Sequence, residues 1–277
     1  MTGTPVVVRD LVVRFGARTA LDGVSMTAQP GQVTAVVGGD GAGKTTLLRA
    51  LVGRVGLSGG SIEAPQPHEI GYLPATTGSW RDLTVQENID FVGGSYGLAP
   101  AVLAERSRRV LSAAGLEPYR DRTSRQLSGG MRRKLGVCLA LLHDPTVLVL
   151  DEPSTGVDPV SRVDLWRLAA QAAAAGATVV MSTTYLDEAE RASQVLVLDR
   201  GSALVAGPPA EIVGDFDVPL TQNHDAIRPE WAWRRGRTFR EVWPTDPPPP
   251  DLATIAADLE DVVIARTLLR ANGRGRG

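Results

Sequence analysis

Cysteine is nearly absent from this sequence, and no long hydrophobic run occurs in it. Cys138 is the only cysteine among 277 residues, so no disulfide can form within the chain, which favours a reducing compartment. A membrane-spanning helix needs about 20 consecutive apolar residues, whereas the apolar stretches here are strand-sized, for example Val147 to Leu150. Residues 1–10 lack the basic and apolar segments of a signal peptide. If the protein works at a membrane, we therefore expect a partner to attach it there.

An excess of charge of one sign is also missing. The 29 Lys and Arg residues nearly balance the 31 Asp and Glu residues, and the net charge of −2 implies no overall attraction to nucleic acid or anionic lipid. The hydrophobic fraction of 43% and the charged fraction of 22% are typical of globular proteins. The length fits one large domain with an appendage, or two domains.

The order of strand-like and helix-like segments predicts an α/β fold. Val33 to Val37 is a continuous apolar strand, as expected when both faces of a sheet are covered. A helix should follow from about Lys44 to Val52, and the alternation continues with a strand at 146–150, a helix at 159–175 and a strand at 177–182. Strands that alternate with helices indicate a mainly parallel sheet.

The character of the sequence changes near Gly214. We predict a core domain over residues 1–214, with a helical subdomain at about 75–143, and a C-terminal appendage over residues 215–277. Arginines and tryptophans alternate within residues 228–243, a pattern that can bind RNA or a membrane surface. Because nothing else resembles a nucleic-acid module, we interpret this part as a solvated linker whose tryptophans dock on the core, and we predict no nucleic-acid partner.

A glycine-rich motif predicts a triphosphate-binding loop. Residues 38–45, GGDGAGKT, match G-x-x-x-x-G-K-[ST] between a predicted strand and a predicted helix. Such a loop points backbone N–H groups at phosphate oxygens, with Lys44 on the β- and γ-phosphates and the Thr45 hydroxyl on Mg²⁺. The alternative is a glycine-rich turn without a ligand. The predicted nucleotide-binding residues here are Gly38, Gly39, Asp40, Gly41, Ala42, Gly43, Lys44, Thr45 and Thr46.

A pair of acids follows the apolar strand that ends at Leu150. We expect Asp151 to hold Mg²⁺, through water, and Glu152 to polarise the attacking water as the general base of hydrolysis. The alternative is two surface acids at the end of a strand. Thr45 and Asp151 are thus the predicted metal ligands, and Glu152 is the predicted catalytic residue.

Between these two elements lies LSGGM, residues 127–131, and with it the chain resembles the ABC ATPase family. The resemblance covers roughly residues 4–213 and is carried by GDGAGKTT (39–46), LSGGMRRKL (127–135) and VLVLDEPSTGVDP (147–159). It implies the P-loop NTPase fold of ABC ATPases. That fold has a mainly parallel sheet core, an antiparallel β subdomain and a helical subdomain, here with a small C-terminal appendage.

The resemblance also implies a mechanism in which two nucleotide-binding domains stack head to tail and trap two ATP molecules. Ser128, Gly129 and Gly130 would then hold a γ-phosphate bound to the partner, and Phe15 would stack on the adenine. The loop at Gly156 to Asp158 would cross the dimer interface. The alternatives are that Ser128 only caps a helix and that Phe15 is an ordinary core residue of a strand.

Two positions depart from the family pattern. Ala75 stands where the family has a glutamine that contacts Mg²⁺ and senses the membrane partner, and Thr184 stands where it has a histidine that orients the γ-phosphate and water. Losing such a group typically costs about 10²–10⁴ in rate. We predict that the site on this chain's own phosphate loop binds ATP but hydrolyses it slowly. Its LSGGM would complete the site of a different, fully equipped chain in a heterodimer.

The chain is most similar in its motifs to the first ATPase half of tandem exporters of the ABC-2 type, whose other half would here be a separate subunit. Residues 258–269, DLEDVVIARTLL, resemble the closing regulatory or dimer-contact helix of drug- and lipid-exporter ATPases. We therefore predict an ATP-binding subunit at the cytoplasmic face of the cell membrane, attached through transmembrane permease subunits that dock near Trp80 to Phe91. The alternative is a soluble ABC ATPase of translation, DNA repair or iron–sulfur assembly.

Overall fold

The chain folds into two compact units. The computed structural model describes residues 3–273, and the chain divides into Met1–Ala203 (unit 1) and Leu204–Gly277 (unit 2). The boundary falls inside strand β9 (Ser202–Gly207), before the position predicted from composition at residue 214. Helix α7 (Pro209–Gly214) explains the difference, because it packs on the C-terminal helix α8 (Leu259–Gly273) and so folds with unit 2.

The core of unit 1 is the central sheet, with strand order β5-β6-β7-β3-β8-β9. Strands β3 (Val33–Val37), β5 (Ile70–Leu73), β6 (Val147–Leu150), β7 (Thr178–Thr183) and β8 (Gln194–Asp199) pair in parallel. All residues of β3, β6 and β7 are buried, because both faces of a parallel sheet are covered. The predicted α/β fold with a mainly parallel core is confirmed.

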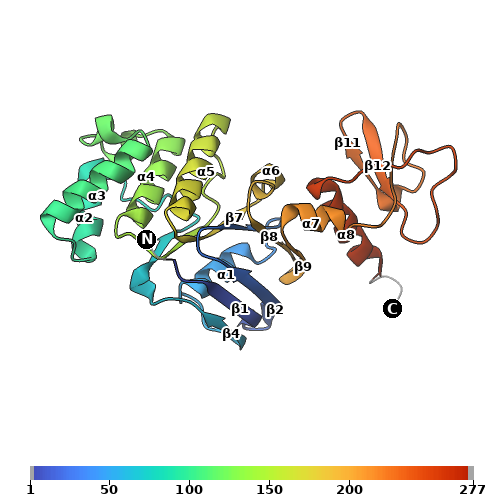
Figure 1. Ribbon diagram of the computed structural model, residues 1–277, viewed down its shortest axis with the longest axis horizontal. Helices are drawn as coiled ribbons and strands as arrows, with labels where there is room; N and C mark the ends of the chain where they lie inside the picture. Colours follow the sequence, from blue (N-terminus) through green and yellow to red (C-terminus); the bar gives the residue numbers. More distant parts are fainter. Residues whose placement is uncertain (1–2, 274–277) are drawn as a thin grey trace. The chain divides into compact units, whose positions relative to one another are not determined.

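A second sheet of unit 1 is antiparallel, with strand order β2-β1-β4, and is coloured blue to cyan in Figure 1. It consists of β1 (Val6–Phe15), β2 (Arg18–Ala28) and β4 (Gly59–Glu63). Its apolar side chains share a buried cluster with leucines of helix α1 (Lys44–Leu51). The antiparallel subdomain implied by the family resemblance is therefore present, and it lies beside the helix that follows the phosphate loop.

Four longer helices of unit 1 pack against one another, as the green to yellow part of Figure 1 shows. They are α2 (Val85–Ser95), α3 (Pro100–Ala113), α4 (Gly129–Leu141) and α5 (Pro159–Ala174), and the short α6 (Leu186–Ala189) follows β7. α3 starts with a proline at its first position, which suits a helix N-terminus. Within residues 3–273 no helix is both long and apolar enough to cross a membrane.

Unit 2 is a small folded body, so the interpretation of its arginine- and tryptophan-rich part, residues 228–243, as a solvated linker is wrong. Strands β10 (Leu220–Asn223), β11 (Ala232–Arg235) and β12 (Thr238–Val242) form an antiparallel sheet in the order β10-β12-β11. The sheet and α8 share an apolar cluster whose buried members are Leu220, Val242 and Ala265. The large apolar residues of this part, Trp231 and Trp233 among them, therefore pack into a separate core of unit 2.

One tryptophan and two arginines of this part have defined partners within unit 2. Trp243 is buried and donates its indole hydrogen bond to the Thr221 hydroxyl at 2.9 Å, and the Arg228 guanidinium lies 3.6 Å from the centre of its ring. Arg235 forms ion pairs with Asp258 at 2.6 Å and with the fully buried Asp261 at 3.0 Å. Arg228 and Arg235 are therefore engaged by partners within unit 2.

Candidate functional site

The parallel register brings the predicted site residues to one edge of the central sheet. Val37, the last residue of β3, pairs with Thr183 at the end of β7, and Leu150 of β6 pairs with Met181 of β7. The residues that follow these three strands are the phosphate loop, Asp151 with Glu152, and Thr184. Ligands of α/β folds bind in the crevice outside the carboxyl ends of such strands, so this edge is the candidate site.

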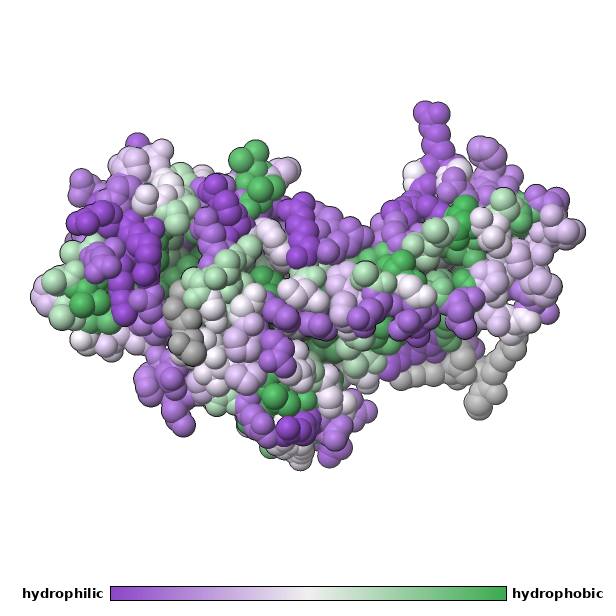
Figure 2. Space-filling view, viewed as in Figure 1, coloured by the Kyte–Doolittle hydropathy of each residue, from purple (hydrophilic) through white to green (hydrophobic). Residues whose placement is uncertain are grey.

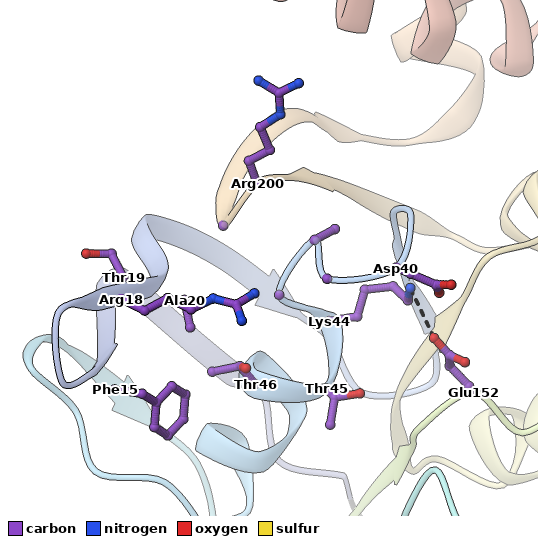
Figure 3. A pocket seen from close by; sticks show the side chains of 14 residues that line it. Phe15, Arg18, Thr19, Ala20, Asp40, Lys44, Thr45, Thr46, Glu152 and Arg200 are labelled. Carbon is purple, nitrogen blue, oxygen red and sulfur yellow. Dashed lines mark ion pairs between the residues drawn. The ribbon is translucent and has the colours of Figure 1, made fainter.

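An open pocket of about 690 Å³ lies at this edge, within the range of small-molecule sites. Figure 3 shows Lys44 facing Glu152 on one side of the pocket and Phe15 at the other end. Phe15 and Glu152 are thus brought together with the phosphate loop around one space. The lining residues are Phe15, Arg18, Thr19, Ala20, Asp40, Gly41, Ala42, Gly43, Lys44, Thr45, Thr46, Glu152, Arg200 and Gly201.

The phosphate loop is wrapped closely around one ammonium group. Lys44 is 4% exposed, and its Nζ donates to the carbonyl oxygens of Gly38 at 2.8 Å and Gly39 at 3.2 Å. The same Nζ forms an ion pair with Glu152 Oε1 at 3.0 Å. Gly43 has a φ of +111°, and a Cβ there would lie 2.7 Å from Leu21 Cδ2, so only glycine fits. The loop therefore presents a buried cation at the pocket floor, as anion binding requires.

Asp151 is fully buried and has one carboxylate oxygen that is satisfied and one that is not. Its Oδ1 accepts hydrogen bonds from the hydroxyls of Thr45 at 3.1 Å and Ser182 at 2.9 Å. Its Oδ2 is buried without a hydrogen-bond partner in the described part of the chain, which is costly for a carboxylate. A threonine hydroxyl beside a carboxylate oxygen is the oxygen donor set that Mg²⁺ prefers. These residues fit a magnesium ion.

Glu152 is held by its backbone in an unusual conformation. Its φ is +47°, a region that costs a non-glycine residue about 1–3 kcal/mol. Its N–H donates to Ser182 Oγ at 2.9 Å, and its Oε2 accepts from the Thr155 hydroxyl at 3.1 Å. The side chain is one-fifth exposed. A strained residue that is fixed at the rim of a pocket is suited to hold a carboxylate against a bound water.

LSGG lies at the N-terminus of α4, away from the pocket of the phosphate loop. Ser128 is the N-cap residue, and its Oγ accepts from the Met131 N–H at 3.2 Å. A Cβ on Gly130 would lie 2.3 Å from Ser161 Oγ, so glycine there lets α4 approach α5. Gly129 lines a separate small hollow with Ala75 and Gly156. One chain alone therefore does not bring Ser128, Gly129 and Gly130 to its own phosphate loop.

Phe15 lies at the end of β1 with 53% of its surface exposed, so it is not a core residue of the strand. The β1–β2 hairpin pairs it with Arg18. The sequence interpretation missed Arg18, Arg200 and Ser182. The hairpin turn after Phe15 was a signal for Arg18, whereas the role of Ser182 depends on the strand order, which the sequence does not contain.

The two positions that depart from the family pattern are both exposed and both follow a strand of the central sheet, Ala75 after β5 and Thr184 after β7. No histidine lines the pocket of the phosphate loop. His143 is elsewhere, stacked on Tyr96 with ring centres 3.8 Å apart, and burial lowers its pKa to about 4. A histidine that stays neutral at physiological pH in a stacked pair has a packing role.

Comparison with known proteins shows which family this chain is similar to. The ABC transporter family model matches residues 21–155. The chain is 37% identical over 222 residues to the Nod factor export ATP-binding protein I of Ralstonia nicotianae, covering 76% of this chain and 69% of that protein. It is 36% identical over 224 residues to the probable multidrug ABC transporter ATP-binding protein YbhF of Escherichia coli, covering 76% of this chain and 39% of that protein.

Solved structures are similar as well. An ATP-binding subunit of an ABC transporter superposes with a TM-score of 0.70 at 27% identity, covering 77% of this chain and 93% of that chain. The cbiO1 protein of Clostridium perfringens, part of the ABC transporter complex cbiONQ, superposes with a TM-score of 0.68 at 25% identity. The superposition covers 76% of this chain and 90% of that chain.

Proposed function

The chain belongs to the ABC transporter family and is one of its ATPases, and we propose that it is the ATP-binding subunit of an ABC-2-type exporter whose membrane part is a separate permease. The observation that carries this proposal is the site at the end of β3. There Lys44, Thr45 and Glu152 line a pocket that has Phe15 at its other end. The buried Asp151 lies behind this lining, where its Oδ1 accepts from the Thr45 hydroxyl. ATP binds there with its phosphates at Lys44 and its adenine at Phe15. Thr45 and Asp151 hold Mg²⁺.

The permease docks on exposed aromatic residues next to α2. Trp80 is 46% exposed and Phe91 is 53% exposed, and their rings meet edge to face with centres 4.5 Å apart. Figure 2 shows a small group of apolar residues at the surface of unit 1 near α2. Exposed aromatic side chains of this kind are the usual anchors of protein interfaces. The subunit is thereby held at the cytoplasmic face of the cell membrane.

Co-purification tests the transporter assignment. The tagged full chain, expressed in its native cells and extracted in detergent, should retain a protein with several membrane-spanning helices. Phe91→Asp should reduce that recovery about tenfold or more, since it places a charge in the interface core. Leu57→Asp, at another exposed apolar residue of unit 1, is the matched control and should retain the partner. Recovery of only ribosomal or DNA-repair proteins, unaffected by Phe91→Asp, would instead favour a soluble ABC ATPase.

We further propose that the site on this chain hydrolyses ATP slowly and works beside a different ATPase subunit. Ala75 offers no polar group to Mg²⁺, and Thr184 carries no titratable group at the end of β7. The phosphate loop and Glu152 remain, so nucleotide binding is kept. Ser128, Gly129 and Gly130 at the start of α4 contact the γ-phosphate bound to that second subunit, and the Gly130 N–H and the helix dipole favour the anion.

Thr184→His should therefore be a gain-of-function substitution. An imidazole after β7 supplies a positioned group that can take and return a proton, so we expect ATP hydrolysis by the full chain to rise about tenfold or more, toward the about 10²-fold typical of one such group. The measurement is the steady-state rate of phosphate release with Mg²⁺. Thr184→Gln, which adds bulk without a titratable group near neutral pH, should leave the rate at the wild-type level. A wild-type rate equal to that of Thr184→His would contradict the slow-site proposal.

A further inference from the structure

Arg133 is a buried arginine whose partners are main-chain atoms of two different segments. It lies in α4, is 7% exposed, and its Nη1 donates to the carbonyl oxygens of Pro74 at 3.2 Å and of Thr76. Its Nη2 donates to the carbonyl oxygen of Ala75 at 2.6 Å and to that of Glu152 at 3.1 Å. Three consecutive carbonyl groups of the loop after β5 and the carbonyl group of Glu152 therefore meet at one guanidinium.

The chemistry of arginine suits this arrangement. A guanidinium is planar and has five donors in a fixed fork, so it can hold several acceptors at defined angles, which an ammonium on a flexible stem cannot. Burial lowers the pKa of Arg133, while the negative charges of Asp151 and Glu152 oppose that shift. A buried charge is costly unless it is fully hydrogen-bonded. The guanidinium and the four carbonyl groups therefore fix one another's positions.

Glu152 is consequently fixed on both sides of its Cα atom. Its N–H is held by Ser182 Oγ at 2.9 Å and its carbonyl oxygen by Arg133, while its φ stays at +47°. The loop at 74–76 follows β5, which pairs with β6 directly before Asp151. Because Ala75 has no polar side chain, the connection between this loop and Glu152 runs through the main chain and Arg133. A displacement of the loop would change the direction of the Glu152 carboxylate.

We propose that Arg133 is a positioning residue for hydrolysis, which holds the Glu152 carboxylate in its working direction and transmits movement of the loop at 74–76 to it. This inference rests on the proposed function, in which Glu152 activates the attacking water. Arg133 touches neither nucleotide nor water in this role. Its removal should therefore lower the rate of the chemical step and leave the affinity for ATP unchanged.

The first test compares Arg133→Met and Arg133→Lys with the wild-type full chain. Single-turnover hydrolysis of ATP with Mg²⁺ should slow about 10²-fold in Arg133→Met, because small misplacement of a reacting group costs about that much. Arg133→Lys should lie between, since an ammonium reaches fewer of the four carbonyl groups. The dissociation constant for ATP should not change. Arg106→Met removes another largely buried arginine, which pairs with Asp144 at 2.8 Å, and should keep the wild-type rate.

A second readout does not depend on the rate. Amide hydrogen exchange should show segments 73–79 and 150–156 of the wild type changing together when ATP and Mg²⁺ are added. In Arg133→Met only segment 150–156 should change. The inference would be overturned if Arg133→Met hydrolysed ATP at the wild-type rate and both of its segments still changed together in exchange. If hydrolysis is too slow to measure, a change of both segments together in Arg133→Met would overturn it by itself. A wild-type chain that does not bind ATP would instead overturn the proposed function, which separates the two failures.

Discussion

Glu152→Gln should abolish most ATP hydrolysis and leave ATP binding intact. We expect the rate of phosphate release to fall about 10²–10⁴-fold, which is what removal of a positioned general base costs. The substitution keeps the shape of the side chain, and the amide oxygen can still accept the hydrogen bond from the Thr155 hydroxyl, which now goes to Oε2 at 3.1 Å. The backbone contacts of Glu152 to Ser182 and Arg133 do not involve the side chain and should persist.

The measurement is single-turnover hydrolysis together with equilibrium binding of ATP. Glu63→Gln provides the matched control, because Glu63 is an exposed glutamate whose ion pair is with Arg9 on the antiparallel sheet. That variant should hydrolyse ATP at the wild-type rate. If Glu152→Gln turned over ATP as fast as the wild type, Glu152 would not be the general base, and the water would have to be activated by another group.

Lys44→Met should nearly eliminate the affinity for ATP. The Lys44 ammonium is 4% exposed at the pocket floor, where it now meets the Gly38 and Gly39 carbonyl oxygens and Glu152. A hydrogen bond to a charged group contributes about 1.5–3 kcal/mol, so loss of contacts to two phosphates should weaken binding about 10²-fold or more. Binding of a nucleoside monophosphate should be affected much less. Titration calorimetry with ATP, ADP and AMP measures the difference.

The only other lysine of the chain supplies the control for this substitution. Lys134 is also mostly buried and also forms an ion pair, with Asp164 at 3.1 Å, but it lies on α4 and does not line the phosphate pocket. Lys134→Met should bind ATP like the wild type. Equal losses in both variants, with equal losses of thermal stability, would mean that Lys44 supports the fold and does not bind phosphate.

Much of unit 1 could be predicted from the sequence, because local patterns and burial agree there. The Val- and Leu-rich strands β3 and β6 are continuous apolar runs, and such runs occur where both faces of a sheet are covered. The loop after β3 and the acids after β6 then lie at the same sheet edge, because parallel strands end on the same side. Lys44, Asp151 and Glu152 could for this reason be placed together before the structure was known.

Contacts that depend on strand order or on the main chain could not be predicted in this way. Ser182 lies far from Asp151 in sequence, and only the β6–β7 pairing brings their side chains to 2.9 Å. Arg133 binds carbonyl groups, which carry no side-chain signal. In unit 2 the strands are short and rich in arginine and tryptophan. Their apolar faces are evident only in the structure, where they share a cluster with Ala265 of α8.

The central claim, that residues 38–45 bind a triphosphate with magnesium, is tested most directly by titrating the purified full chain with ATP in the presence and absence of Mg²⁺. We predict saturable binding that is tighter with Mg²⁺, because Thr45 and Asp151 would then hold the ion, and the Asp151 carboxylate has an oxygen without a hydrogen-bond partner in the described part of the chain. We also predict that this gain disappears in Asp151→Asn. Absence of binding, or binding that Mg²⁺ does not strengthen, would contradict the account.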